Sequence, residues 1–498
     1  MQTEPHVDWC RKWAEYSPDQ IALKEIESGK TLTYSEWNDL SHSTAYHLQS
    51  KNKIKKGDRI AILSENGLEH LVLFGVACKL GFILVPLNYR LSPSEIEYLL
   101  KDSGPALIFV ESKFRDLLDE NRNNDAIPIE SVIDTAKNQL TAEIRIDFGI
   151  SHTDPVFILY TSGTTGYPTG ALYTHGMMFW NSLNTSLRLN ITSKSRTINV
   201  MPPFHTGGWN VFTTPFLHHG AYTCLLKKFD ANTVLELLKS ERITLFMGVP
   251  TMLKMMTEQE KFNEIELPSL EYIIVGGEPL PIPVIEKWAE KNVMIRQGYG
   301  MTEVGPNLTS LHDRDALRKK GSIGFPNFYV DWRIVDHESS QHTLADTGEL
   351  QFKGPIVTPG YWNQPQATKD AFTDDGWFKS GDIIHRDEEG YFYVVDRIKN
   401  MFISGGENVY PAEVERVILQ YPDIKEVIVT GIPDTKWGEA GKAFIVLKNN
   451  VQFDETQFYD FCRKHLAAFK VPKSICLIDA IPKNDTGKMD RKIVRSWS

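Results

Sequence analysis

Apolar and polar positions alternate in a regular rhythm over the first part of the chain, from Ile21 to about Ile150. Short apolar runs, which are typical of buried strands, alternate there with amphipathic segments that are typical of helices. The clearest series is DRIAILSENG, LEHLVLFGVACKLG, FILVPLN, SPSEIEYLLKDSG and ALIFVES. This strand, helix, strand order predicts a parallel sheet covered by helices.

A similar rhythm returns between Pro155 and about Leu308. Its segments are VFILYTSG, RTINVMPPFH, AYTCLLKK, ANTVLELLKSERIT, LFMGVP and EYIIVGGEP. We therefore predict two α/β sheet subdomains within one large N-terminal region.

The pattern changes between Gly324 and Arg397, where helices nearly disappear. Short strands separated by Gly, Pro and Asp turns predict a small β-rich barrel or ribbon, built from VDWRIVD, GELQFKG, GYWNQP, GWFKSGD and GYFYVVDR. After Lys399, helical and strand patterns alternate again and predict a compact α+β domain of ordinary size. The predicted domains are residues 1–398 and residues 399–498.

Composition and charge narrow the possible functions. The 498 residues carry a formal charge of -10, which argues against a protein that coats nucleic acid. The five cysteines form no CxxC pair, so a reduced, cytoplasmic setting is expected. The most apolar stretch, HLVLFGVACKLGFILVPLNY, is interrupted by Lys79, Gly81 and Pro86, so we predict a buried helix and strand there and no membrane span. We expect a monomer or a homodimer.

The loop YTSGTTGYPTG, residues 160–170, is the first candidate for chemistry. By itself a loop of Ser, Thr and Gly is compatible with a flexible linker or with a phosphate cradle. This loop follows an apolar strand pattern, at the end of a strand where α/β folds bind ligands, and its glycines allow backbone N–H groups to converge on phosphate oxygens. It lacks the lysine of a GxxxxGK[ST] loop, which disfavours that class of nucleotide site.

Five motifs occur together in order: YTSGTTGYPTG, MPPFHTGGW, QGYGMTE, SGDIIHRDEEGYFYVVDRIKN and PKNDTGKMDRK. With them the chain resembles the AMP-forming adenylating superfamily, which includes acyl-CoA synthetases, peptide-synthetase adenylation domains and beetle luciferases. The motifs extend from about Phe157 to Arg491. The resemblance implies that an acid is activated with ATP to an acyl-adenylate and then transferred to a thiol, with release of AMP and pyrophosphate.

The resemblance also implies roles for the residues that bind ATP. Tyr299 would stack on adenine, Thr302 would contact a phosphate or the acyl carboxylate, and Glu303 would hold Mg²⁺. Asp382 and Arg397 would bind the ribose, because a carboxylate can accept two hydroxyl hydrogen bonds. The complete implied set is Thr161, Ser162, Gly163, Thr164, Thr165, Gly166, Gly277, Glu278, Pro279, Gln297, Gly298, Tyr299, Gly300, Asp382 and Arg397, with Thr165 and Glu303 as metal ligands.

Further residues are implied for catalysis, for domain motion and for the other two substrates. Lys488 would enter the active site during adenylation, and His205 would lie beside the carboxylate that is activated. Lys399 occupies the family's hinge position, about which the C-terminal domain would rotate to admit CoA. The implied CoA tunnel is Ser404, Gly405, Gly406, Glu407, Trp437 and Lys470. The implied acyl pocket is His205, Trp209, Gly276, Gly277 and Met301.

One position departs from the family pattern, because many members have lysine where this chain has Thr169. Binding of the outer phosphates of ATP would then depend more heavily on Mg²⁺ and on Lys488.

The segments expected to line the acyl site contain aromatic, small and apolar residues, which suit a fatty or an aryl acid. The first hypothesis is a medium- or long-chain fatty acid. The resemblance disfavours amino acids, because peptide-synthetase adenylation domains place an aspartate early in the pocket to pair with the amino group, and this chain has no clear counterpart around Trp209 or Phe212. Three alternatives stay open: an aryl-CoA ligase for a benzoate-like or succinylbenzoate-like acid, an acyl-AMP ligase that loads a carrier protein, and a non-catalytic acyl or nucleotide sensor. The expected partners are a carboxylic acid, ATP with Mg²⁺, and CoA.

Overall fold

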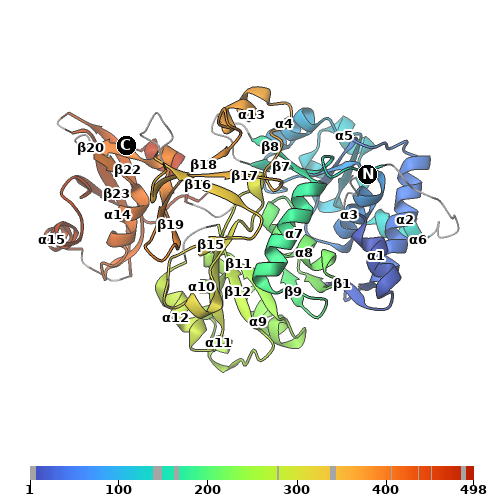
Figure 1. Ribbon diagram of the computed structural model, residues 1–498, viewed down its shortest axis with the longest axis horizontal. Coiled ribbons are helices and arrows are strands. Elements are labelled where there is room, and N and C mark those ends of the chain that lie inside the picture. The colour runs from blue at the N-terminus through green and yellow to red at the C-terminus, as the bar shows by residue number, and fades with distance from the viewer. Residues whose placement is uncertain are drawn as a thin grey trace. The chain divides into compact units, whose positions relative to one another are not determined.

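The structure is a computed structural model that describes most of the chain (Figure 1). The described residues are 7–137, 149–161, 168–277, 280–336, 344–404, 407–435, 437–449, 451, 453–483 and 489–497. Their packing defines two compact units, one formed by residues 1–332 with 352–378 and the other by residues 333–351 with 379–498. The predicted α/β fold class is confirmed, and the boundary at residue 398 stays a prediction.

A six-stranded sheet lies in the first unit, in the order β6-β5-β3-β4-β7-β8. Its strands are β3 (Arg59–Leu63), β4 (Ile83–Pro86), β5 (Leu107–Val110), β6 (Ile127–Pro128), β7 (Pro155–Thr161) and β8 (Thr169–Thr174). The pairs β3–β4, β3–β5, β5–β6 and β4–β7 are parallel, whereas β7–β8 is antiparallel. The first predicted series of strands and helices is therefore confirmed.

Both faces of this sheet are covered by helices, as the alternation of side chains along β3 shows. Ile60 and Ile62 belong to the hydrophobic core that packs against α2 (Tyr34–Ser50) and α3 (Leu68–Leu80). Ala61 and Leu63 point the other way, into the core that contains α4 (Pro93–Ser103).

Helix α3 accounts for the most apolar stretch of the sequence. Every residue of α3 except Glu69 is buried, which explains why apolar residues occur on all sides of the helix. Among the helices of the described residues, none is both long enough and apolar enough to cross a membrane.

Two further sheets complete the first unit, with strand orders β2-β1-β10-β9 and β11-β12-β13-β14-β15. Their strands are β1 (Ile21–Glu25), β2 (Thr31–Thr33), β9 (Arg196–Asn199), β10 (Tyr222–Leu225), β11 (Leu245–Gly248), β12 (Tyr272–Val275), β13 (Met294–Tyr299), β14 (Thr309–Ser310) and β15 (Phe325–Pro326). Strand β1 pairs in parallel with β10, which places Leu23 opposite Thr223. The two predicted series therefore share a sheet, an arrangement that local periodicity does not reveal.

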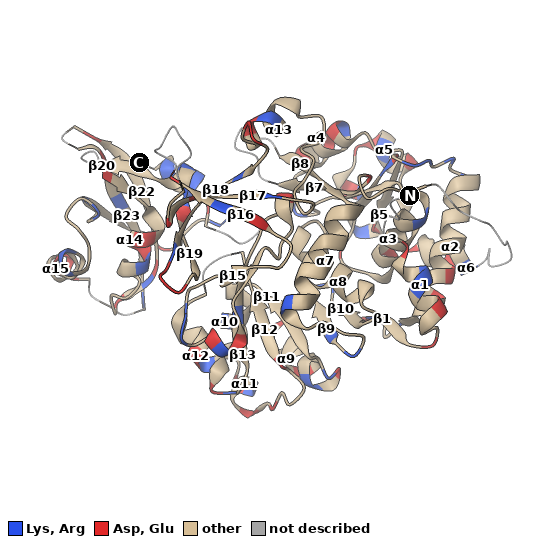
Figure 2. Cartoon of the chain, in the orientation of Figure 1, with Lys and Arg blue, Asp and Glu red and all other residues tan. Residues whose placement is uncertain are grey.

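The remaining helices of this unit are mostly short. They are α1 (Trp9–Tyr16), α5 (Glu120–Asp125), α6 (Ser131–Lys137), α7 (His175–Leu189), α8 (Thr213–His218), α9 (Ala231–Ser240), α10 (Pro250–Thr257), α11 (Glu260–Glu264), α12 (Ile282–Ala289) and α13 (Pro365–Ala371). Acidic and basic residues lie together on outer helices such as α1 and α12, so charge is balanced locally (Figure 2). One such pair joins Lys12 Nζ to Glu15 Oε2 at 2.8 Å.

Helix α13 corrects the expectation that residues 360–365 form a strand. Tyr361 makes only an isolated bridge to Ala171, and the helix begins at Pro365. Proline suits the first position of a helix because the N–H that it lacks would have no partner there.

The second unit contains two sheets. The first has the order β16-β17-β18-β19. A few residues at strand ends of this sheet, such as Phe352 and Phe378, are assigned to the first unit. The second has the order β21-β20-β23-β22, with β24 paired in parallel to β23. The strands are β16 (Asp331–Val335), β17 (Thr347–Lys353), β18 (Phe378–Arg386), β19 (Phe392–Arg397), β20 (Phe402–Ser404), β21 (Glu407–Val409), β22 (Ile424–Asp434), β23 (Gly438–Leu447) and β24 (Ser474–Leu477), and the helices are α14 (Pro411–Ile418), α15 (Glu455–His465) and α16 (Arg491–Arg495).

Candidate active site

The strands on either side of the Ser/Thr/Gly loop form a hairpin. Thr161 ends β7 directly opposite Thr169, which begins β8, and the Thr161 hydroxyl donates to the Thr169 carbonyl at 3.4 Å. Strand β8 leads without a break into α7. Ten predicted site residues lie outside the described residues: Ser162, Gly163, Thr164, Thr165, Gly166, Glu278, Pro279, Gly405, Gly406 and Lys488.

Glu303 lies on a short 3₁₀ helix, η3 (Thr302–Val304), which follows β13. Its carboxylate Oε1 accepts a hydrogen bond from the Tyr361 hydroxyl at 3.1 Å. Its backbone carbonyl accepts a second one from the Thr358 N–H at 2.7 Å. The motifs did not single out Tyr361, since only the fold brings it to Glu303. Burial and the neighbouring Glu303 carboxylate raise the pKa of Tyr361, so its hydroxyl stays protonated and donates.

The segment from Thr358 to Trp362 also contacts the strand that leaves the loop. The Trp362 N–H donates to the Gly170 carbonyl at 2.8 Å, and the Leu172 N–H donates to the Gly360 carbonyl at 3.0 Å. One short segment therefore connects β8 to Glu303 within the first unit.

The glycines around β13 are fitted closely to their neighbours. A Cβ on Gly300 would lie 2.3 Å from the Pro306 carbonyl group, so a side chain there would clash and only glycine fits. A Cβ on Gly298 would lie 3.3 Å from the Thr309 carbonyl oxygen. Between them, the Tyr299 ring stacks near Phe352, with ring centroids 6.4 Å apart.

Other residues predicted for ATP and the acid are engaged in packing. The Gln297 side chain is buried and accepts a hydrogen bond from the Gly321 N–H at 3.1 Å. Trp209 is also buried, donates from Nε1 to the Pro203 carbonyl at 2.7 Å, and packs on Phe157 with ring centroids 5.0 Å apart. A place for Trp209 in the acyl wall stays a prediction.

The remaining predicted acyl residues lie at strand ends and in loops. His205 is half-buried, and its ring meets Phe204 edge-on with centroids 4.5 Å apart. Gly276 follows β12, and a Cβ there would lie 3.3 Å from the Gly298 carbonyl oxygen. Gly277 has a φ of 89°, which favours glycine. Met301 and Thr302 are half-buried.

Asp382 and Arg397 face each other in the second unit, on β18 and β19. Arg397 Nε lies 3.0 Å from Asp382 Oδ1, and the aspartate is buried whereas half of the arginine side chain is exposed. The backbone N–H of Asp382 donates to the Ser380 hydroxyl at 3.1 Å. The cross-strand register therefore brings these two predicted residues together, and their binding of a ribose stays a prediction.

Lys399 lies two residues beyond Arg397, on a 3₁₀ turn, η5 (Ile398–Asn400). Desolvation lowers its pKa, and the nearby cations Arg397 and Lys492 lower it further. The Arg495 guanidinium donates to the Lys399 carbonyl at 3.1 Å. The predicted hinge position thus lies among the cations Arg397, Lys492 and Arg495, with the carboxylate of Asp382 acting in the opposite direction.

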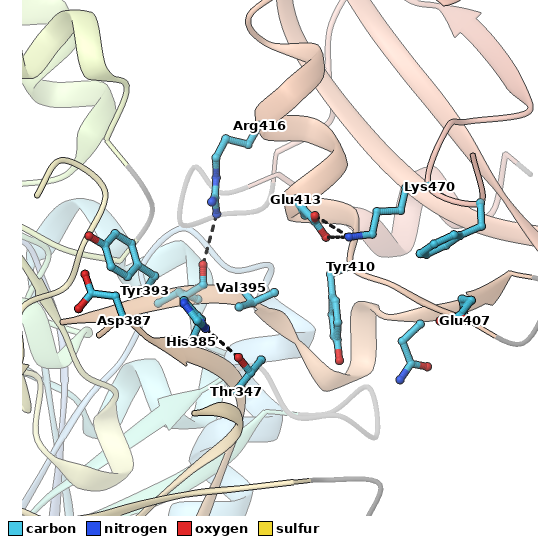
Figure 3. Close-up of a pocket in the computed structure, with 13 residues that line it drawn as sticks. Thr347, His385, Asp387, Tyr393, Val395, Glu407, Tyr410, Glu413, Arg416 and Lys470 are labelled. Atoms are coloured by element: carbon cyan, nitrogen blue, oxygen red, sulfur yellow. Dashed lines mark hydrogen bonds and ion pairs between the residues drawn. The ribbon is translucent and has the colours of Figure 1, made fainter. Parts of the chain in front are cut away.

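A cavity of about 810 Å³ in the second unit is lined by two of the predicted CoA residues, Glu407 and Lys470 (Figure 3). Lys470 Nζ is held 2.6 Å from Glu413. Tyr410 and Phe469 add aromatic faces to the lining. Asp387, Glu407 and Glu413 lie in the same lining, so carboxylates outnumber the cations Lys470 and Arg416 there.

The other two described residues of the predicted tunnel do not line this cavity. Ser404 ends β20 and is buried. The Lys473 ammonium lies over the ring of Trp437, 5.5 Å from the ring centroid.

The residues of this site can bind Mg²⁺ only if a substrate supplies further ligands. Among the described residues there is no group of three or more His, Cys, Asp or Glu side chains that could hold a metal ion. Mg²⁺ is commonly bound by one or two carboxylates plus substrate phosphates, and Glu303 can supply one carboxylate. The chemistry of this site therefore fits a metal that arrives with ATP.

Two protein-family domains match the chain: "AMP-binding enzyme" over residues 10–362 and "AMP-binding enzyme C-terminal domain" over residues 413–488. The chain belongs to the AMP-binding enzyme family, and its class is that of the AMP-forming acid–CoA ligases.

Relatives and solved structures agree with this class. The chain is 36% identical to the long-chain-fatty-acid–CoA ligase FadD13 of Mycobacterium tuberculosis, over 98% of each chain. It is 34% identical to a feruloyl-CoA synthase of Amycolatopsis, over 99% of each. The O-succinylbenzoate coenzyme A synthetase of Bacillus subtilis, solved with ATP and a magnesium ion, is 30% identical over 98% of this chain and 99% of that one, with a TM-score of 0.85. A small-molecule acid, ATP and CoA fit this class as substrates.

Proposed function

We propose that this ligase activates a medium- or long-chain fatty acid to its acyl-CoA thioester through an acyl-adenylate. The observation that carries the adenylation step is the hydrogen-bonded connection from β8, next to the Ser/Thr/Gly loop, to Glu303. The fatty acid is favoured by the relative named for long-chain fatty acids, and the apolar and aromatic residues at the predicted acyl site are compatible with it.

The first half-reaction must bring a carboxylate against the α-phosphate of ATP, and these two anions repel each other. In this proposal Glu303 and Thr165 hold Mg²⁺, which would neutralise phosphate charge when bound. The amides and hydroxyls of the loop bind the outer phosphates, and Lys488 stabilises the charge that develops as pyrophosphate leaves. Tyr299 contacts adenine, and Asp382 with Arg397 orients the ribose.

The second half-reaction requires a thiol to reach the adenylate before water does. We assign Lys399 as the hinge about which the C-terminal domain rotates, withdrawing Lys488 and presenting the loop after Ser404. Glu407 and Lys470 are proposed CoA contacts, which is supported by their presence in one cavity. For Lys470 to bind a CoA phosphate, its ion pair with Glu413 must open.

An aryl acid is the second candidate, and the similarity to the feruloyl-CoA synthase favours it. Aromatic side chains can pack on a flat ring as well as on an alkyl chain. The two candidate substrates differ in shape, because a fatty acid requires a long, narrow pocket and an aryl acid requires a flat one.

A panel of acids tests the proposal. Pyrophosphate exchange and AMP release would be measured with fatty, aryl and amino acids, with and without CoA. The fatty-acid proposal predicts the highest kcat/KM with medium or long chains, and CoA-dependent AMP release. A higher kcat/KM with aryl acids would replace it by the second candidate. Adenylate that CoA cannot discharge would indicate a carrier protein as acceptor, and no exchange with any acid would indicate a sensor.

A further inference from the structure

Tyr361 and Glu303 are 58 positions apart in the sequence and are joined by a hydrogen bond. The phenol oxygen of Tyr361 lies 3.1 Å from Oε1 of Glu303. Both residues are half-buried, so water weakens this bond less than it would on an exposed surface. A hydrogen bond to an ionised carboxylate is stronger than one between neutral groups. The phenol therefore restricts the orientation in which Glu303 presents its carboxylate.

The backbone of Tyr361 is itself held firmly in place. Its N–H donates to the Thr368 hydroxyl at 2.9 Å, and it bridges to Ala171 on β8. Preceding it, Gly360 has a φ of 142°, and a Cβ there would lie 2.4 Å from Thr368 Cγ2. The phenol thus extends from a backbone with little freedom to move.

From this geometry we propose that Tyr361 is a positioning residue for the magnesium–ATP site. Its hydroxyl holds the Glu303 carboxylate in the orientation that binds the metal, and its backbone ties that carboxylate to the strand leaving the phosphate loop. The inference rests on the proposed role of Glu303 as a metal ligand. A side chain that hydrogen-bonds a metal ligand commonly changes metal affinity without touching the metal.

The test is Tyr361→Phe, which removes only the hydroxyl. A matched control is Tyr222→Phe, because the buried Tyr222 hydroxyl donates to Glu241 Oε2 at 2.8 Å and so forms another phenol–glutamate bond of the first unit. ATP binding to each variant would be measured by calorimetry while free Mg²⁺ is varied, and Mn²⁺ binding in the presence of ATP by electron paramagnetic resonance. Neither readout depends on turnover.

We expect Tyr361→Phe to raise the free Mg²⁺ needed for half-maximal ATP binding by about tenfold. ATP binding in EDTA should stay unchanged, and Tyr222→Phe should match the wild type in both conditions. An unchanged Mg²⁺ requirement in Tyr361→Phe would overturn the inference. So would an equal loss of ATP binding with and without Mg²⁺, since that pattern indicates a structural role only.

Glu303→Gln separates this inference from the proposed function. If Glu303→Gln abolishes the Mg²⁺ dependence of ATP binding and Tyr361→Phe leaves it unchanged, only the positioning role fails. If Glu303→Gln itself keeps the wild-type Mg²⁺ dependence, the metal-ligand assignment fails and the positioning role fails with it. If the inference holds, adding Tyr361→Phe to Glu303→Gln should not change the Mg²⁺ dependence of ATP binding further, because Glu303→Gln has already removed the carboxylate that Tyr361 orients.

Discussion

Asp382 and Arg397 stand directly opposite each other on neighbouring strands, with Arg397 Nε 3.0 Å from the Asp382 carboxylate. The aspartate is buried and the arginine is half exposed, so the guanidinium orients a carboxylate that has little other freedom. This arrangement suits a carboxylate that must accept hydrogen bonds from a ribose.

Asp382→Asn should weaken ATP binding by about tenfold or more, because an amide oxygen is a weaker acceptor than a carboxylate. The specific test compares ATP with 2′,3′-dideoxyATP by calorimetry. We expect the wild type to prefer ATP and Asp382→Asn to lose most of this preference. Asp346→Asn, which removes an exposed partner 4.0 Å from Arg386 in the same sheet, should keep it. A preference for ATP that survives in Asp382→Asn would contradict the ribose assignment.

The register that joins these two residues shows what the sequence could predict. Alternating apolar runs predicted β18 and β19 individually, and the family resemblance paired Asp382 with Arg397. The same local patterns could not pair β1 with β10, because nothing in the alternation within 21–25 encodes a partner near 223. The contact of Tyr361 with Glu303 was missed for the same reason, and α13 was missed because seven residues starting at Pro365 carry little helical periodicity.

Thr169→Lys tests the departure from the family pattern. Thr169 begins β8 opposite Thr161 and is half-buried, so a long side chain there can extend toward solvent and the loop. A cation close to the outer phosphates should lower the apparent KM for ATP by a few-fold, or about 1 kcal/mol. Steady-state kinetics at low ionic strength would measure it. An unchanged KM would contradict the view that a lysine is missing.

His175 predicts how stability depends on pH. It is fully buried at the start of α7, and among the described residues neither ring nitrogen has a hydrogen-bond partner. Burial lowers the pKa of His175 to about 4, from an ordinary value near 6.5. Between these values the unfolded chain binds a proton that the folded chain does not, so stability falls as pH falls from about 6.5 to about 4, by about 3 kcal/mol for this group.

His175→Leu should therefore flatten the loss of stability in acid. The measurement is the midpoint of thermal unfolding at several pH values between 4 and 7. His47→Gln, at a half-buried position on α2, serves as the control and should follow the wild type. Parallel curves for His175→Leu and the wild type would show that this histidine does not contribute.

A buried ion pair attaches α1 to the core of the first unit. Lys79 Nζ lies 2.9 Å from Asp8 Oδ2 and 2.8 Å from Asn38 Oδ1. Lys79→Met should reduce the free energy of unfolding by about 3 kcal/mol, because it leaves the Asp8 charge without its partner. Asp8→Leu combined with Lys79→Met should recover much of that loss.

Urea unfolding followed by tryptophan fluorescence would measure these differences. Lys12→Met, which breaks the exposed pair with Glu15, should cost less than about 1 kcal/mol. Equal losses for Lys79→Met and Lys12→Met would refute the stabilising role of the buried pair.

The central claim is that one chain first makes an acyl-adenylate and then transfers the acyl group to CoA, with Lys488 needed only for the first step. The most direct measurement is mass spectrometry of single-turnover reactions with wild type and Lys488→Ala. We predict that wild type accumulates acyl-AMP without CoA and converts it to thioester when CoA is added. Lys488→Ala should make almost no acyl-AMP, yet convert supplied acyl-AMP to thioester at nearly the wild-type rate. Equal loss of both steps in the variant, or release of ADP in place of AMP by the wild type, would contradict the account.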